Sequence, residues 1–471
     1  MKELMAKPVL LIFVAAYFAA LIGIGIYYSR RIREDNADDF VLAGRSLGPF
    51  VLMGTFLATY VGSGTISGGG NSLAYNFGIW PGIFFALPAI GAIIVLGLLS
   101  NRIRSFGSYT VAEILQQKYG ETARFISGII IALAMISICA YQYRGLAYVL
   151  NITTGMDIRI GTAIGAFIII FLAFSGGLKS VAVSDAFSAF MMLFGIVLAT
   201  PFVIRAAGGW GNVIASAPPE ALTFTGGQTF YGFLAGYFPL FFLSMGDQNL
   251  YQRIIAARGK KENRWGIIGW FIGIVIVIPL VAVIAFCAKH IFGTNIEAGM
   301  AFMSTTTVVP TFVGGILLAA ATAFIVTTGD SYLLSGATNI TYDIYVEKFN
   351  PNATEEEKLK VTRIAIALAG IFAYILLQFF PSVLAIQYWS YTIYGAGITP
   401  ALLAALIWKR VTKTGGIASM IVGTIVTIAW EILKQPYGIA TVLVAVPISI
   451  ITLVVVSLVT QPKDLGLAES K

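Results

Sequence analysis

Long apolar segments, separated by short polar connections, recur throughout this chain. Residues 164–174 and 266–286 are apolar throughout, without the alternation expected of a strand with one buried face. A helix of about 20 apolar residues crosses the ~30 Å of hydrocarbon in a bilayer. Because hydrocarbon cannot hydrogen-bond to a backbone, each segment has to satisfy its own amides and carbonyls. The pattern therefore predicts an all-α polytopic membrane protein.

Composition agrees with this fold class. Hydrophobic residues make up 58% of the chain and charged residues 11%, whereas soluble domains carry roughly 25% charged residues. We predict one transmembrane domain over 1–471 with about 13 spans, and the segment 309–345 is long enough to continue as a helix beyond the membrane. The approximate limits of the spans are 8–28, 48–73, 79–100, 123–151, 158–175, 180–205, 228–253, 264–288, 309–345, 361–380, 383–408, 415–433 and 438–460.

The distribution of basic residues predicts the orientation. If the N-terminus lies outside, the loops after the odd-numbered spans are cytoplasmic, and these hold most of the 30 Lys and Arg residues, among them Arg30, Arg253 and Lys348. Basic residues close to span ends are retained in the cytoplasm. We therefore predict a protein of the cell inner (plasma) membrane with its N-terminus outside and its C-terminus in the cytoplasm.

Several function classes are excluded by what the sequence lacks. It contains no GxxxxGK[ST] or HExxH motif, and its loops are too short for a nucleotide-binding domain. The one histidine, His290, lies at a predicted helix end, and Cys139 and Cys287 both lie inside spans. We expect neither an enzyme nor a nucleic-acid partner, and no required protein partner is evident. The expected partners are the lipid bilayer, a small solute and an ion.

Two spans contain residues that do not suit an ordinary helix. Glycines crowd positions 62–70 of the second span, and Gly246, Asp247, Gln248 and Asn249 form a polar cluster late in the seventh. Interrupted helices at matching positions mark the binding site of many transporters. The alternative for the glycines is close helix packing, and the alternative for the polar cluster is an interfacial helix end. The spacing of five spans predicts inverted repeats over 48–205 and 228–408. The helix 8–28 precedes them and the pair 415–460 follows.

Buried carboxylates indicate an ion site. Asp185 and Asp330 lie in apolar segments, where charges are costly and usually functional. Thr327, Asp330 and Ser331 stand at i, i+3 and i+4, so they share one helix face. Such oxygen ligands suit a hard cation such as Na⁺. The alternative for the threonines is a hydrogen bond to their own helix.

Arg144 is a further charge within a span. It can pair with Asp185, Asp247 or Asp330, or extend its side chain to the membrane interface. Alternatively its guanidinium binds a carboxylate of the solute.

Several motifs resemble those of the sodium:solute symporter family. They are DDFVLAGRS at 38–46, GGLKSVAVSD at 176–185, DQNLYQR at 247–253 followed by two alanines, and DIY at 343–345. The resemblance extends over about 8–460. It implies a LeuT-like fold with two inverted five-helix repeats.

The resemblance also implies sodium ligands. The family's common sodium site corresponds to backbone carbonyls of Ala58, Val61 and Phe324 and the hydroxyls of Thr327 and Thr328. A second site, found in members similar to sialic acid transporters, corresponds to Asp185, Thr327, Asp330 and Ser331. Asp330 stands where those members have a hydroxyl, so the number of sodium ions stays open.

Substrate contacts are implied at positions on three spans. They correspond to Tyr60, Gly62 and Thr65 on the second span, Arg144 on the fourth, and Asp247 and Gln248 on the seventh. Sugar-binding members have glutamine at the position of Thr65, which argues against a hexose.

The resulting prediction is sodium-coupled symport of a small organic solute, with a carboxylate or amino acid favoured, by alternating access. One alternative is a proton-coupled carrier that uses Asp185 and Asp330. A channel or receptor with a carrier fold is another.

Overall fold

The computed structural model describes residues 5–29, 42–108, 110–175 and 178–461. Residues 38–41 and 176–177 of the family motifs lie outside this part. The described chain is helical, apart from an isolated bridge between Leu47 and Ala257. Its first half contains α1 (Leu10–Ser29), α3 (Pro49–Tyr60), the π-helical turn η2 (Gly64–Gly68), α4 (Gly69–Phe77), α5 (Ile79–Phe84), α6 (Ala86–Phe106), α7 (Val111–Tyr119), α8 (Glu121–Thr154), α9 (Ile158–Ser175) and α10 (Leu178–Ala206).

The second half likewise consists of long helices joined by short ones. It contains α11 (Trp210–Ser216), α12 (Phe230–Gly246), α13 (Gln248–Ala256), α14 (Lys260–Phe292), α15 (Ala301–Ser304), α16 (Thr311–Asn339), the π-helical η6 (Ile340–Phe349), α17 (Glu355–Leu377), α18 (Val383–Gly397), α19 (Thr399–Ile407), α20 (Lys413–Ile432) and α21 (Val442–Val459).

The described helices agree with the predicted spans. Nine are long and apolar enough to cross a membrane, and the bent pair Pro49–Tyr60 and Gly64–Phe77 makes a tenth. The other three predicted spans are also helical: they correspond to α1, α9 and the pair α12–α13. The predicted long segment 309–345 is α16, which continues through η6 to Phe349, as expected.

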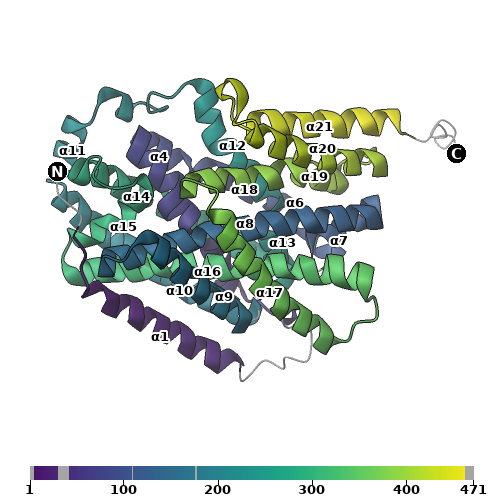
Figure 1. Cartoon of the computed structure of the whole chain (residues 1–471), viewed down its shortest axis with the longest axis horizontal. Coiled ribbons are helices and arrows are strands. Elements are labelled where there is room, and N and C mark those ends of the chain that lie inside the picture. The colour runs from purple at the N-terminus through teal and green to yellow at the C-terminus, as the bar shows by residue number, and fades with distance from the viewer. Residues whose placement is uncertain (1–4, 30–41, 109, 176–177, 462–471) are drawn as a thin grey trace.

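Burial divides the helices into a centre and a periphery. The most apolar stretch of α16–η6 is 89% buried and that of α8 is 72% buried, whereas α17, α20 and α21 each bury 33%. Figure 1 shows α1 along one side of the bundle and α20 and α21 along the opposite side. The helices α16, α8 and the pair α18–α19, whose most apolar stretch is 83% buried, are therefore the ones whose polar residues have to find partners inside the protein.

Candidate functional site

The second predicted span breaks where its glycines begin. Helix α3 ends at Tyr60, Val61 has non-helical φ and ψ of −94° and 91°, and the chain bends by 48° before it continues. A Cβ on Gly62 would lie 2.6 Å from Thr328 Oγ1, so only glycine fits this close approach. The glycines thus serve both alternatives drawn from the sequence, a discontinuous helix and close packing against α16.

The seventh predicted span breaks at Asp247. Its φ and ψ of −54° and 115° end α12, and its Oδ1 accepts a hydrogen bond of 2.9 Å from the amide of Asn249, the second residue of α13. All nine residues of α13 are buried. The chain therefore continues as a buried helix past Asp247, and the expected pair of interrupted helices is confirmed.

The two breaks lie side by side. Ser244 Oγ, at the end of α12, lies within hydrogen-bond distance, 3.2 Å, of the hydroxyl of Tyr60 at the end of α3. The hydroxyl of Tyr394 donates to the carbonyl of Gly246 over 2.6 Å. Helix α18, which carries Tyr394, therefore contacts the second break.

Gln387 on α18 holds the first break in place. Its Nε2 donates to the carbonyl of Gly64 over 2.9 Å, and its Oε1 accepts from the amide of Gly69 over 3.0 Å. The same Nε2 lies 3.0 Å from the hydroxyl of Tyr391, which hydrogen-bonds to the hydroxyl of Tyr141 over 3.1 Å. One glutamine thus satisfies backbone groups that the broken helix leaves without helical partners.

Oxygen atoms of α3 and α16 meet below the first break. The hydroxyl of Thr328 donates to the carbonyl of Ala58 over 2.8 Å, and Val61 and Phe324 are fully buried beside them. Because α3 ends at Tyr60, its last carbonyls are available to other partners. Thr327 donates to the carbonyl of Ala323 over 2.9 Å, which is the self-bonding alternative, but its oxygen keeps lone pairs for a cation. The donor set is chemically suited to sodium.

Asp185 forms an ion pair that the sequence did not predict. Its Oδ2 lies 3.1 Å from Nη2 of Arg253 and 2.5 Å from the hydroxyl of Thr55, and both charged side chains are fully buried. Arg253 also donates to Thr55 over 2.8 Å and to Ser331 Oγ over 3.0 Å. The prediction that Arg253 lies in a cytoplasmic loop is wrong, because α13 carries it into the bundle.

Two carboxylate oxygens remain available at this ion pair. In the described part of the chain, Oδ1 of Asp185 and Oδ1 of Asp330 are buried and have no hydrogen-bond partner. Ser331 lies next to Asp330 and contacts Arg253, which in turn contacts Asp185. The structure therefore links three of the four side chains expected for a second cation site, and Thr327 lies on the same helix.

Among the described residues, Arg144 does not form the internal ion pair that was one of its alternatives. Its Nη1 donates to the carbonyl of Phe380 over 3.3 Å, and the side chain is partly exposed. Tyr141, Arg144 and Tyr148 stand at i, i+3 and i+7 of α8, so they share one face. Arg144 thus lies one turn away from the tyrosine pair at the first break.

A cavity of about 270 Å³ leads from this face of α8 toward the surface. Its lining includes Tyr148, Glu297, Ser382 and, from the first break, Ser67. The hydroxyl of Tyr148 donates to Glu297 Oε2 over 2.9 Å. Thr65, two residues before Ser67 in η2, is buried. The cavity therefore reaches the first break at Ser67.

Comparison with known proteins decides the family. A model of the sodium:solute symporter family matches residues 40–423, which is most of the chain. The chain belongs to this family. The symporter is accordingly a multi-pass membrane transporter coupled to sodium, and not an enzyme, as the motifs indicated.

Relatives of this symporter extend over nearly its whole length. Sodium/proline symporters of Staphylococcus aureus, such as that of strain JH9, are 26% identical over 96% of this chain and 92% of theirs. The structure of a Na⁺-coupled sialic acid symporter in a substrate-bound outward-open state superposes with a TM-score of 0.80 at 19% identity, over 96% of this chain and 98% of that one. Mhp1, a nucleobase-cation-symport-1 family transporter in a closed conformation, superposes at 0.59 with 12% identity, over 91% and 96%. These likenesses confirm the LeuT-like fold.

Sequence reasoning missed three residues of the symporter's central site. Arg253 follows the seventh apolar segment and reads as a loop residue, although a break at Asp247 already implied that the helix continues. Gln387 and Tyr391 stand four residues apart on one face of α18. A lone glutamine within a span was the signal, because a buried amide requires partners.

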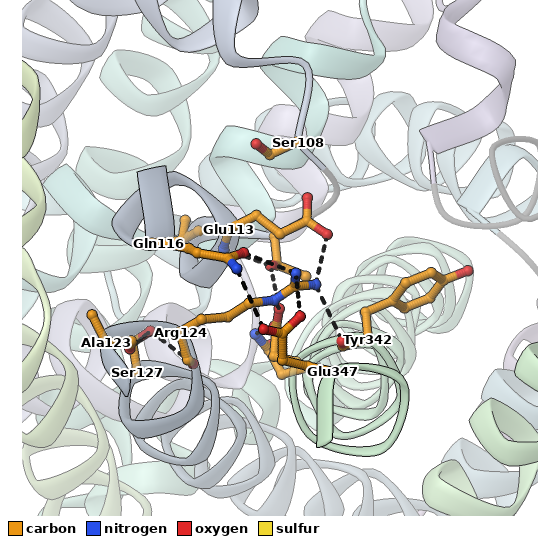
Figure 2. A network of polar contacts seen from close by, with 12 residues as sticks. Ser108, Glu113, Gln116, Ala123, Arg124, Ser127, Tyr342 and Glu347 are labelled. Atoms are coloured by element: carbon orange, nitrogen blue, oxygen red, sulfur yellow. Dashed lines mark hydrogen bonds and ion pairs between the residues drawn. The ribbon is translucent and has the colours of Figure 1, made fainter. Parts of the chain in front are cut away.

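At one end of the symporter, Arg124 joins three helical elements. Figure 2 shows its guanidinium among acidic side chains of α7 and η6. The guanidinium lies 2.9 Å from Glu113 Oε1, 2.8 Å from Asp343 Oδ1 and 3.0 Å from Glu347 Oε2. It also donates to Gln116 over 2.9 Å. These contacts fix the short helix α7 against α8 and the end of α16–η6.

Gln248 connects this network to the second break. Its Nε2 donates to Ser335 Oγ over 2.9 Å and to Asn339 Oδ1 over 2.6 Å. Its Oε1 accepts from the amide of Val111 over 3.1 Å and from Asn339 Nδ2 over 3.0 Å. Asn339 in turn donates to Asp343 over 2.8 Å. Both the oxygen and the nitrogen of the Gln248 side-chain amide therefore have hydrogen-bond partners.

Proposed function

We propose that the symporter moves a small carboxylate or amino acid together with sodium by alternating access. The observation that carries this proposal is the direct contact between the two broken helices, Tyr60 with Ser244, beside oxygen groups that join α3 to α16. Facing breaks near the middle of a bundle form substrate and ion sites in secondary transporters. The cargoes named for the relatives, proline and sialic acid, both carry a carboxyl group.

Sodium would bind where α3 meets α16. The proposed ligands are the carbonyls of Ala58, Val61 and Phe324 and the hydroxyls of Thr327 and Thr328. Because these ligands come from two helices, an ion between them would favour conformations in which the helices are close. An ion can shift a conformational equilibrium only by its difference in affinity for the two states. This difference is the proposed source of coupling.

A second cation is proposed at the buried acidic pair. Asp185 and Asp330 each offer an oxygen without a hydrogen-bond partner, and Ser331 and Thr327 supply hydroxyls nearby. The rival occupant is a proton, which would make the transporter partly proton-coupled. Sodium is favoured because hydroxyl and carboxylate oxygens surround the position.

The solute would bind between the breaks. Proposed contacts are Tyr60, Gly62 and Thr65 at the first break and Asp247 at the second. Arg144, on the same face of α8 as Tyr148, would receive the carboxylate. Gln248 remains a predicted contact. Because its side-chain amide already has hydrogen-bond partners, it is better suited to positioning Asp247.

The proposed orientation places the N-terminus outside the cell inner membrane and the C-terminus in the cytoplasm. It rests on the asymmetric distribution of Lys and Arg in the loops.

The test is transport current in proteoliposomes, recorded with small acids, amino acids and sugars, each with and without sodium. The proposal predicts a current that requires sodium together with a carboxylate or amino acid. A current that a pH gradient drives without sodium would instead assign Asp185 and Asp330 to a proton path.

A further inference from the structure

The buried charges inside the bundle do not balance. Among the described residues, Asp185, Asp247, Asp330 and Arg253 are buried near the breaks. Arg253 pairs with Asp185, and a cation at Asp330 would complete that site. This leaves Asp247. An uncompensated charge within a membrane is costly, so a carboxylate there needs a cation or a proton.

Asp247 meets only neutral donors in the described chain. Its Oδ1 accepts from the amide of Asn249, and its Oδ2 accepts from the hydroxyl of Tyr332 over 2.5 Å. Arg253, six residues further along, is occupied by Asp185, Thr55 and Ser331. Each oxygen of Asp247 therefore has one neutral partner and retains capacity to accept from a charged donor.

Tyrosines lie around this break. Tyr332 touches the carboxylate, the hydroxyl of Tyr394 donates to the carbonyl of the adjacent Gly246, and the hydroxyl of Tyr60 lies 3.2 Å from Ser244 Oγ at the end of α12. Aromatic rings attract ammonium groups through the negative charge of their faces, and hydroxyl oxygens accept N–H hydrogen bonds. Hydroxyl-bearing aromatic rings together with one carboxylate suit an ammonium better than a metal ion, for which the α3–α16 and Asp185–Asp330 positions offer more hard oxygens.

We infer that Asp247 is the acceptor for a protonated amine on the transported solute. The cargo is then an amino acid or a similar small acid that bears an ammonium group, and not a nitrogen-free acid or a sugar. The inference rests on the proposed function, which it deepens by naming the group that the second break recognises. Gln248 holds the adjacent backbone in register through Ser335 and Asn339.

The experiment compares cargoes that differ only at nitrogen. Sodium-dependent currents are recorded in proteoliposomes with a panel of L-amino acids, and each active compound is matched with its nitrogen-free isostere, for example proline with tetrahydrofuran-2-carboxylate. Asp247→Asn and Asp247→Glu are tested alongside the wild type. We expect the isosteres to be at least 100-fold weaker, and Asp247→Asn to lower the apparent affinity for amines at least tenfold, with Asp247→Glu less affected.

Two further measurements distinguish a structural role for Asp247 from a role in binding the amine. Sodium should still raise the melting temperature of purified Asp247→Asn, which shows that the fold and ion sites persist. Tyr332→Phe removes a donor but retains the carboxylate, so it should keep the preference for amines. If nitrogen-free acids or sugars give sodium-dependent currents, and Asp247→Asn leaves those currents unchanged, the inference is overturned. Sodium symport would still stand in that case. No sodium-dependent current with any cargo would contradict the proposed function itself.

Discussion

Asp185 and Arg253 form the most deeply buried ion pair among the described residues, and each depends on the other. Both side chains are fully inaccessible, with 3.1 Å between Nη2 and Oδ2. Removing one partner of a buried pair costs about 3–5 kcal/mol, because the remaining charge stays buried and uncompensated. The pair is thus both a structural element and, through the second oxygen of Asp185, half of a proposed cation site.

Asp185→Asn should therefore lower stability by roughly 3 kcal/mol or more and weaken sodium activation of transport. The double variant with Arg253→Gln removes both charges of the pair, so part of the stability should return. Sodium activation should not return, because the carboxylate is still absent. Melting temperature and the sodium dependence of uptake measure the two effects. Unchanged sodium activation in Asp185→Asn would remove Asp185 from the ion site.

At the residue scale the sequence was informative where a charge interrupts an apolar segment. Asp185, Asp247 and Asp330 stood out for this reason. Arg253 did not, because it lies at the edge of its segment and only the continuation of the helix past Asp247 buries it. Tyr391 was missed because an aromatic residue in a span is unremarkable until its partners are known.

At the scale of elements, the contact between α3 and α16 depends on the absence of a side chain at Gly62. A Cβ there would approach three side-chain atoms of Thr328 at 2.6–2.8 Å. Gly62→Ala should push the two helices apart and reduce sodium-driven uptake at least tenfold. Gly48→Ala, just before α3, meets nothing within 4 Å and is the matched control. Equal uptake in the two variants would contradict the proposed role of this contact.

The Arg124 network makes a second prediction about elements. Arg124→Gln leaves Asp343, whose side chain is fully buried, without its cation, while Glu113 and Glu347 are partly exposed. We expect a loss of about 2 kcal/mol, less than for a fully buried pair, measured as a lower melting temperature. Arg124→Lys should restore little, because an ammonium cannot reproduce the geometry of a guanidinium. A lysine variant as stable as the wild type would show that charge alone suffices.

Helices were predicted best where apolarity alone defines them. The long spans and both breaks follow from continuous apolar segments and from glycine or polar clusters within them. The short helix α7 was expected to be loop, because its nine residues mix polar and apolar side chains and it is fixed by tertiary contacts such as those of Arg124. The π-helical turns η2 and η6 have no periodicity that distinguishes them from α-helix.

For the whole molecule, the asymmetry of basic residues predicts which ends of the helices face the cytoplasm. Cys139 and Cys287 are buried, so labelling of the native thiols should be low. Tyr437→Cys, at a site that is 97% exposed, should react with a membrane-impermeant maleimide in intact cells. Phe349→Cys, at a site that is 74% exposed, should react only after permeabilisation. The reverse pattern would invert the topology.

Coupling is also a property of the whole molecule, and it has a thermodynamic signature. If sodium and solute favour the same conformations, each must raise the affinity for the other by the same factor. The connection proposed here runs through Thr328, whose hydroxyl meets the carbonyl of Ala58 across the contact between α3 and α16. Thr328→Ser keeps that hydroxyl, whereas Thr328→Ala removes it.

The most direct test is calorimetric titration of purified protein with the transported solute at several sodium concentrations, and with sodium at several solute concentrations. We predict equal reciprocal shifts in the two dissociation constants for the wild type and for Thr328→Ser. For Thr328→Ala we predict that sodium changes the dissociation constant of the solute by a factor near one. Independent binding of sodium and solute in the wild type, or full coupling in Thr328→Ala, would contradict this prediction.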